Sequence, residues 1–166
     1  MLYCIGNSDK SKWLKARIWM ETSVMSDWNH KIIEEFRAKG GRGVGPFGDQ
    51  LLLLTTRGAR SGKPHTTPLA FHRDRGRFIV IASMGGAPRH PAWYHNLLTN
   101  PEAEIEVGAD KIRVRATPVA GGPERDRLYG QQAEIMPGFR EYEKKTTRVI
   151  PAVVLEPVAA EAAAAA

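Results

Sequence analysis

The sequence predicts an α+β protein, mostly β, built on a small antiparallel barrel of six strands with flanking helices. Three observations lead to this fold class. Six short segments have the apolar patterning of strands, most of them are joined by turns short enough for hairpins, and helical patterns are inserted between them. The 166 residues, 42% apolar and 25% charged, are sufficient for one globular domain with its own core.

The first element expected in the barrel domain is a helix over residues 27–39. Its apolar residues recur at helical spacing, Ser26 can serve as the N-cap, and Gly40 and Gly41 follow the last turn. The apolar positions are Trp28, Ile32, Ile33 and Phe36. A glycine-rich connection then leads to the strands.

Three strands are expected next, over residues 51–57, 65–73 and 77–84. The segment Asp74-Arg75-Gly76 separates the last two, and its glycine suits a tight hairpin turn. A loop of small residues follows the third strand.

Prolines mark the elements of the second half. Pro91 suits the first turn of a short helix, Pro137 ends a longer helix, and Pro151 must occupy an edge or a bulge of the last strand because it lacks an N–H group. The expected elements are a helix over 91–98, a hairpin of strands 103–107 and 111–119, a helix over 123–136, one or two helical turns in 141–147 and a strand over 148–156.

The two ends of the chain are expected to lie outside the barrel domain of residues 25–157. Residues 1–24 form a basic leader in which residues 9–22 have the pattern of a short helix with tryptophans beside lysines. Such a helix suits an anionic membrane surface, and a dispensable leader is the equal alternative. Residues 158–166 are a low-complexity tail.

The chain has neither a membrane-spanning apolar run nor a secretory signal, and its single cysteine cannot form an internal disulfide. We therefore expect a cytoplasmic protein. Peripheral contact with the inner face of the cell membrane would be made through the leader.

Positive charge is concentrated in residues 51–95. This segment holds seven Lys or Arg residues against one acidic residue, whereas the rest of the chain holds 17 of each. Four of the five histidines lie there as well. A focused positive field indicates an anionic partner, whether nucleic acid, phospholipid or a phosphorylated cofactor.

The strongest local signal is the segment TTRGARSGKP, residues 55–64. Its glycines suit a turn whose backbone N–H groups form an anion nest, and Arg57, Arg60 and Lys63 would add charge-assisted bonds to phosphate oxygens. The spacing is not that of a Walker loop. The alternative is a hairpin whose basic side chains only face solvent.

A second signal is the small-residue segment ASMGGAP, residues 82–88, which lets a ligand approach the backbone closely. The helix that follows offers Trp93 or Tyr94 as an aromatic wall. The alternative is that Trp93, Leu97 and Leu98 form only the core face of that helix.

The sequence lacks the motifs for metal binding, for a nucleophilic serine and for catalysis by paired carboxylates in residues 51–95. Metal-ligand spacings such as Cys-x-x-Cys are missing, Ser61 and Ser83 have no nucleophile-elbow motif, and Asp74 is the one acid between residues 51 and 95. We therefore expect no metal, and we expect a cofactor to carry the reaction.

Several segments, in consistent order, resemble the deazaflavin-dependent nitroreductase and quinone reductase family of actinobacteria, split-barrel reductases that use coenzyme F-420. The segments are LLLLTTRGARSGKP at 51–64, ASMGGA at 82–87, PAWYHNL at 91–97, NP at 100–101 and RVIPAVVLEP at 148–157.

The resemblance implies a six-stranded, FMN-binding-like split barrel with an anionic cofactor whose phosphate and oligoglutamate tail cross a basic groove. It places the phosphate and tail on Ala59, Arg60, Ser61 and His65, with Lys63 nearby, and the ring system along Ala82, Ser83, Met84 and Gly85. Arg57 and Thr67 are further cofactor-binding candidates. It adds Ala92, Trp93 and Asn96 on the helix and a substrate pocket roofed by Met136, Phe139 and Tyr142.

The implied reaction is hydride transfer from the reduced deazaflavin to an electron-poor conjugated acceptor, such as a quinone, an enone-containing lactone or a nitroaromatic. Ser83 and Tyr142 are the catalytic candidates, since either hydroxyl could polarise a carbonyl or donate a proton. Three departures stand out: the family often has Arg at His65, Lys at Met84, and tyrosines near Met136 and Phe139.

Two alternatives remain open. The same barrel could bind FMN, whose short phosphate tail needs fewer cations. A non-enzymatic barrel could instead bind single-stranded nucleic acid through its arginines and aromatic side chains. We expect a small-molecule acceptor as the partner and no nucleic acid.

Overall fold

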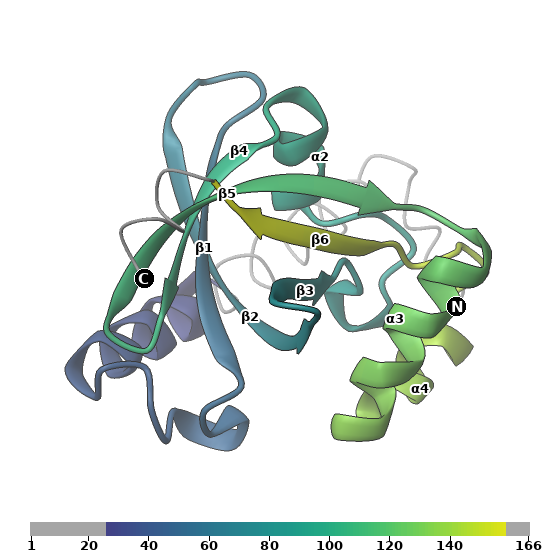
Figure 1. Cartoon of the computed structure of the whole chain (residues 1–166), viewed down its shortest axis with the longest axis horizontal. Coiled ribbons are helices and arrows are strands. Elements are labelled where there is room, and N and C mark those ends of the chain that lie inside the picture. Colours follow the sequence, from purple (N-terminus) through teal and green to yellow (C-terminus); the bar gives the residue numbers. More distant parts are fainter. Residues whose placement is uncertain (1–25, 159–166) are drawn as a thin grey trace, which may run out of the picture.

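The computed structural model describes residues 26–158, in which six strands form one closed barrel with helices around it (Figure 1). The strand order is β1-β2-β3-β6-β5-β4, and every neighbouring pair is antiparallel. The predicted six-stranded split barrel is therefore confirmed. The strands are β1 (Leu51–Arg57), β2 (Pro64–Asp74), β3 (Arg77–Ile81), β4 (Glu102–Val107), β5 (Asp110–Val119) and β6 (Ala152–Pro157).

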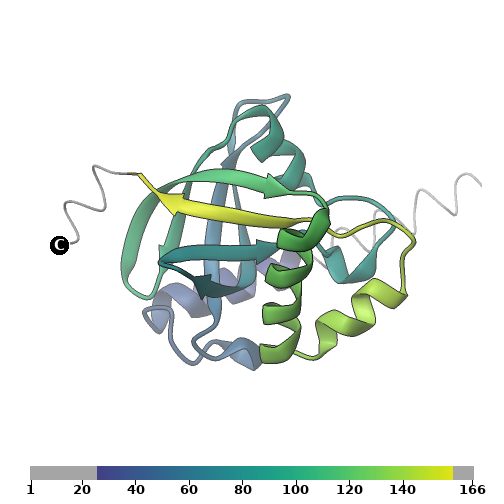
Figure 2. The same ribbon diagram turned by 45° about the vertical axis from the view of Figure 1, so that its right-hand side comes forward.

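The helices pack on two sides of the barrel. A helix over residues 26–38 covers the outer face of β1, and α3 crosses β3 and β6 on another side (Figure 2). The remaining helical elements are α2 (Ala92–Thr99), α3 (Gly122–Ile135), α4 (Gly138–Lys144) and the short 3-10 turns η1 (Gly45–Phe47) and η2 (Met84–Gly86).

Both faces of β1 are buried, which explains its uninterrupted run of leucines. Leu52 and Leu54 point into the barrel core, whereas Leu51 and Leu53 pack with Phe36 beneath the first helix. A third apolar cluster fills the space between the outer faces of β3 and β6 and the helices α3 and α4. The helices therefore cover the outside of the barrel on these sides.

The turn between β2 and β3 consists of Arg75 and Gly76, both with positive φ, at 53° and 78°. This is the backbone of a type I′ hairpin turn, which matches the right-handed twist of the strands. The predicted hairpin is confirmed, at the cost of one non-glycine residue in the left-handed region.

Three predicted boundaries were wrong. β3 ends at Ile81 rather than residue 84, because the backbone is already helical at Ser83, with φ of −79° and ψ of −38°, and Met84 follows with a left-handed φ of 46°. Pro137 ends α3 as predicted, but α4 starts directly after it and ends at Lys144. β6 starts at Ala152, so Pro151 precedes the strand and no bulge is needed.

The predicted leader, its membrane-binding helix over residues 9–22 and most of the tail lie outside the described residues. Within residues 26–158, no helix combines the length and the apolar character needed to cross a bilayer.

Candidate functional site

The turn between β1 and β2 is held by its own hydrogen bonds. The amide of Gly58 donates to the carbonyl of Lys63 at 2.8 Å, and the amide of Gly62 donates back to Gly58 at 2.9 Å. The amide of Lys63 donates to the hydroxyl of Ser61 at 3.2 Å. These three amides are therefore not available to the predicted anion nest.

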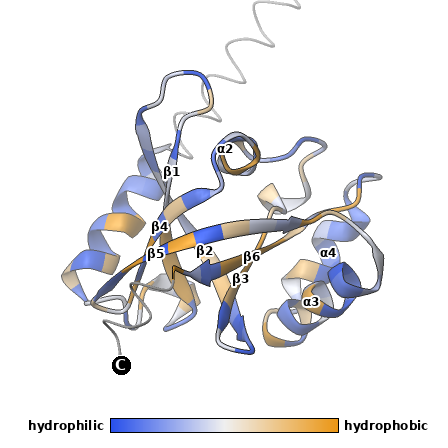
Figure 3. Cartoon of the chain, turned by 45° about the horizontal axis from the view of Figure 1, so that its top comes forward, coloured by the Kyte–Doolittle hydropathy of each residue, from blue (hydrophilic) through white to orange (hydrophobic). Residues whose placement is uncertain are grey.

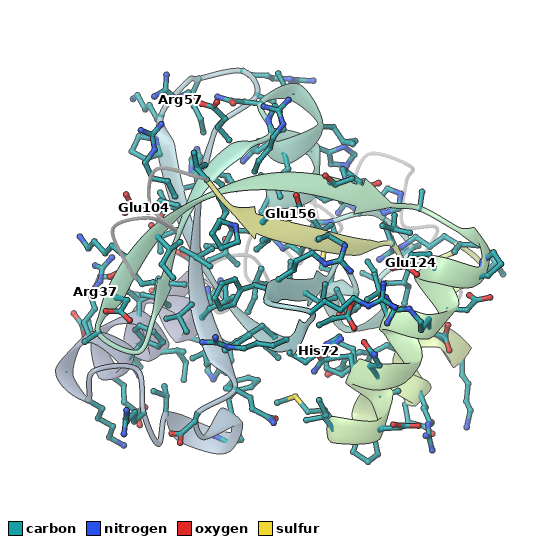
Figure 4. All side chains as sticks on the ribbon, viewed as in Figure 1. Arg37, Arg57, His72, Glu104, Glu124 and Glu156 are labelled. Carbon is teal, nitrogen blue, oxygen red and sulfur yellow. The ribbon has the colours of Figure 1, made fainter. Side chains whose placement is uncertain are left out.

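The basic side chains of this turn are exposed. Arg57, Arg60 and Lys63, which we call the hairpin cations, have no acidic partner among residues 26–158. Ser61 and His65 are exposed beside them. In Figure 4, Arg57 lies at the end of the hairpin that projects from the barrel. The turn is therefore a cluster of unpaired donors that face solvent.

The strand register divides these residues between two faces. Thr56 pairs with His65, and Leu54 pairs with Thr67. His65 and Thr67 therefore lie on the same face of the hairpin as Leu54, whose side chain points into the barrel core. Arg57 pairs with Pro64 and lies on the opposite face. The structure thus does not bring all the predicted phosphate residues to one face of the hairpin.

Gly58 allows two of these side chains to pack against the backbone. A Cβ atom at this position would lie 2.5 Å from Oγ of Ser61 and 3.1 Å from Nε2 of His65. Both distances are too short for an ordinary contact, so any larger residue would displace the Ser61 and His65 side chains.

Helix α2 braces the turn through the buried side chain of Asn96. Its Oδ1 accepts from the amide of Ala59 at 3.0 Å, and its Nδ2 donates to Oγ1 of Thr56 at 3.1 Å. The amide of Ala59 is therefore also lost to an anion. Asn96 acts on the site through these contacts, and a direct contact with a cofactor stays a prediction. The sequence analysis did not identify Thr56, because its hydrogen bond with Asn96 of α2 joins residues that are 40 positions apart in the chain.

Trp93 lies in the barrel core and is only 5% exposed. It closes the core beneath α2 instead of presenting an open wall, which agrees with the core alternative for this helix. Leu97 joins the same core, whereas Leu98 is 55% exposed and was wrongly assigned to it. Ala92 is exposed at the start of the helix.

The loop after β3 is held by an arginine that the sequence analysis did not single out. Arg148 donates from Nη2 to the carbonyls of Ala82 at 3.2 Å and Ser83 at 3.0 Å, and from Nε to the carbonyl of Ala87 at 2.9 Å. Ala82 and Ser83 are buried, whereas Met84 and Gly85 are exposed.

A fourth contact of Arg148 fixes the state of His90. Nη1 of Arg148 lies 3.1 Å from Nδ1 of His90, and since a guanidinium can only donate, this nitrogen must accept. Burial, with Arg148 and His95 nearby, lowers the pKa of His90. His90 is therefore neutral in this contact.

Helix α4 packs directly on the loop. A Cβ atom at Gly86 would lie 2.8 Å from the carbonyl oxygen of Tyr142 and 2.9 Å from Cβ of Lys145. Tyr142 packs edge-on against Phe139, with ring centroids 5.2 Å apart, and both are half-buried against the outer cluster under α3. The structure thus brings the backbone of Tyr142 to the loop of residues 82–88, while a roof of Phe139, Tyr142 and the half-buried Met136 stays a prediction.

The positive charge of residues 51–95 does not form one field. Asp74 is buried between Arg77, at 2.7 Å, and Arg127, at 2.9 Å, and Glu124 adds a second carboxylate for Arg127. Hydrogen bonds from Arg127, then from Arg77, hold the pKa of Asp74 well below its usual range. His72 is also buried here, against Gln132 and Gln131 of α3. The predicted single field was therefore wrong.

Figure 3 shows hydrophilic segments at both turns, the tip of the β1–β2 hairpin and the β2–β3 turn, and Figure 4 places Glu124 of α3 away from Arg57. The two turns end an eleven-residue strand, which spans roughly 30 Å. Among residues 26–158, the hairpin end therefore offers three exposed cations without an acidic partner, Arg57, Arg60 and Lys63.

The residues present fit a polyanionic cofactor better than a metal. In residues 26–158, no three His, Cys, Asp or Glu side chains gather where they could hold a metal ion. The hairpin cations supply donors for phosphate or carboxylate oxygens. A Cβ atom at Gly62 or Gly85 would meet nothing within 4 Å, so the backbone is open to an approaching ligand at both places.

The closed antiparallel barrel, which carries a cationic turn and a loop of small residues, defines a split-barrel oxidoreductase of the FMN-binding-like fold class. The model of the F420H(2)-dependent quinone reductase family matches residues 28–157. An F420H(2)-dependent quinone reductase of Mycobacterium tuberculosis is 37% identical over 152 residues, covering 89% of this chain and 97% of the relative. The chain therefore belongs to the F420H(2)-dependent quinone reductase family.

Solved structures agree with this assignment. A structure described as an F420-H2 dependent reductase is 35% identical, with a TM-score of 0.59, and covers 64% of this chain and 94% of its own. A second, described as a domain-swapped dimer, is 33% identical, with a TM-score of 0.62, and covers 79% and 98%. The predicted family, enzyme class and deazaflavin cofactor are confirmed, and neither the FMN nor the nucleic-acid alternative is favoured.

Proposed function

We propose that this protein reduces quinones with the reduced deazaflavin, and that the hairpin cations hold the anionic phosphate and tail of the cofactor. The observation that carries the proposal is the pairing state of Arg57, Arg60 and Lys63. They are exposed and lack acidic partners in the described part of the chain, which belongs to a family that uses this cofactor. Each charged hydrogen bond to an oxyanion contributes about 1.5–3 kcal/mol.

When bound, the reduced deazaflavin supplies a hydride equivalent. The protein provides orientation and proton transfer. The backbone from Ala82 to Gly85 is the surface on which we place the ring system, because its residues are small or, at Met84, point into solvent. Fixing the ring against the acceptor is the main contribution expected of these residues.

Ser83 and Tyr142 are proposed as the groups that polarise the acceptor carbonyl and deliver a proton. Neither hydroxyl has a hydrogen-bond partner among residues 26–158, so both remain available to a substrate. They come from neighbouring elements, since the backbone of Tyr142 in α4 packs against Gly86, three residues after Ser83 in the same loop. The acceptor is proposed to be a quinone, and enone lactones and nitroaromatics share its electron-poor conjugation.

The test is an anaerobic assay in which the reduced cofactor is mixed with protein and menadione. We expect menadione-dependent return of the oxidised cofactor's absorbance, with Tyr142→Phe and Ser83→Ala each lowering kcat about tenfold or more. Parallel assays with an enone lactone and a nitroaromatic define the acceptor range. Cofactor binding without oxidation by any of the three acceptors would contradict the proposal.

A cytoplasmic location with peripheral membrane contact through residues 9–22 is a separate proposal. Its support is the pattern of lysines and tryptophans in that segment. Full-length protein is expected to pellet with anionic liposomes, and protein lacking residues 1–24 is expected to stay in solution. Equal pelleting of both would contradict membrane contact through this segment.

A further inference from the structure

Arg148 is half-buried and has no carboxylate within reach among residues 26–158. A guanidinium removed from water without a counter-ion is costly unless its donors find acceptors. Arg148 meets this condition with three carbonyl oxygens and one imidazole nitrogen, all in the segment from Ala82 to His90. Burial lowers the pKa of Arg148.

The contacts of Arg148 fix the orientation of two successive peptide groups. All peptide bonds in the described residues are trans, so the C=O and N–H of one peptide group point in opposite directions. Because Nη2 of Arg148 holds the carbonyls of Ala82 and Ser83, the amides of Ser83 and Met84 must point away from it. Neither amide has an acceptor in the described part of the chain.

The same segment holds a backbone conformation that the chain would not adopt freely. Met84 has a φ of 46°, and left-handed backbone costs a non-glycine residue about 1–2 kcal/mol. Such conformations persist where surrounding contacts over-determine them. Here the contacts come from Arg148 on one side and from α4, packed against Gly86, on the other.

The guanidinium geometry is needed for this arrangement. Nε, Nη1 and Nη2 reach three different parts of the segment at once, the carbonyl of Ala87, the ring of His90 and the two carbonyls after β3. The single ammonium of a lysine cannot span these positions.

The geometry points to Arg148 as a positioning residue for hydride transfer: it fixes the Ala82–Ala87 backbone, on which the deazaflavin ring is placed by the proposed function. Arg148 acts through this backbone and not by contact with the cofactor tail. Loss of its planar donors should therefore misplace the ring while the hairpin cations continue to hold the phosphate.

The first test does not involve the cofactor. Hydrogen–deuterium exchange of the full chain should be faster in residues 82–90 of Arg148→Lys than in wild type, with residues 55–65 unchanged. Arg140→Gln, which removes an exposed arginine of α4, is the matched control and should leave both segments unchanged. Unchanged exchange in residues 82–90 of Arg148→Lys would overturn the inference, whatever the protein's activity.

The second test separates positioning from general stability. For Arg148→Lys we expect the single-turnover rate of menadione reduction to fall tenfold or more, the Kd of the oxidised cofactor to change less than threefold, and the absorbance band of the bound ring to shift. An equal loss of rate and cofactor affinity, together with a lower Tm, would show a merely structural role and overturn the inference. Wild-type protein that fails to bind the cofactor would instead reject the proposed function.

Discussion

The two turns at the ends of β2 use arginine for opposite purposes. At the β1–β2 turn, Arg57 and Arg60 are exposed and have no acidic partner in residues 26–158. At the β2–β3 turn, Arg77 and the helix residue Arg127 close on the buried carboxylate of Asp74. A count of charges along the sequence does not distinguish the two turns, because both lie in the basic segment of residues 51–95. Their pairing shows that one end is available to a ligand and the other stabilises the fold.

The network at the β2–β3 turn joins the barrel to α3. Arg127 donates to both carboxylate oxygens of Asp74 at 2.9 Å, and Gln131 of the same helix adds a third contact at 3.3 Å. Substitutions here should change stability and leave cofactor binding intact, whereas substitutions among the hairpin cations should do the reverse. The following predictions test this contrast in order of expected size.

The largest effect is expected for Asp74→Asn. Removing the charge leaves Arg77 and Arg127 without their shared carboxylate, and breaking such a buried pair costs about 3 kcal/mol. Urea unfolding should show this loss, while the Kd for the cofactor should stay within twofold of wild type. Asp110→Asn, at an exposed turn, is the control and should change neither.

Acid should reproduce part of this effect. Because the pKa of Asp74 is lower in the folded chain than in the unfolded chain, its stabilising contribution is complete above the unfolded value of about 4 and is lost as the pH falls below it. The free energy of unfolding of Asp74→Asn should therefore fall less steeply between pH 4 and pH 2 than that of wild type. Parallel pH profiles would contradict a structural role for the carboxylate.

The next effect concerns the loop after β3, residues 82–88. Gly86→Ala should cost about 2 kcal/mol of stability, because the new methyl group meets the backbone of α4 at 2.8 Å and φ is 86°. Gly85→Ala has φ of 64° but open space, so it should cost only about 1 kcal/mol. Equal unfolding midpoints for the two variants would mean that α4 does not pack on this loop as described.

Local patterns were sufficient to predict most of the fold. The leucine run of β1, the Arg75-Gly76 turn and the proline at the end of α3 each act through neighbours in sequence, and each element was found close to its observed position. The boundaries of β3 and β6 were wrong because they depend on tertiary contacts. Met84 is turned left-handed beside α4, and the carbonyl of Pro151 accepts from the amide of Ala82 across the sheet.

The site was predicted less completely than the fold. The hairpin turn could be recognised from its composition, but nothing in the sequence shows that Asn96 would use its amide on the turn or that Arg148 would hold a loop more than sixty residues away. Charge pairing is equally non-local, since Asp74 finds Arg127 on α3. Such contacts form only once the barrel has closed, and a local sequence pattern cannot predict which distant residues that closure brings together.

The most direct measurement of the central claim is a fluorescence titration of the apo-protein with the cofactor, comparing Arg60→Gln with Arg75→Gln. Each variant removes one exposed arginine, the first from the β1–β2 turn and the second from the β2–β3 turn. We predict that Arg60→Gln raises Kd about tenfold, corresponding to about 1.4 kcal/mol, and that Arg75→Gln changes it less than twofold. Equal effects of the two substitutions would contradict the assignment of the hairpin cations to the cofactor.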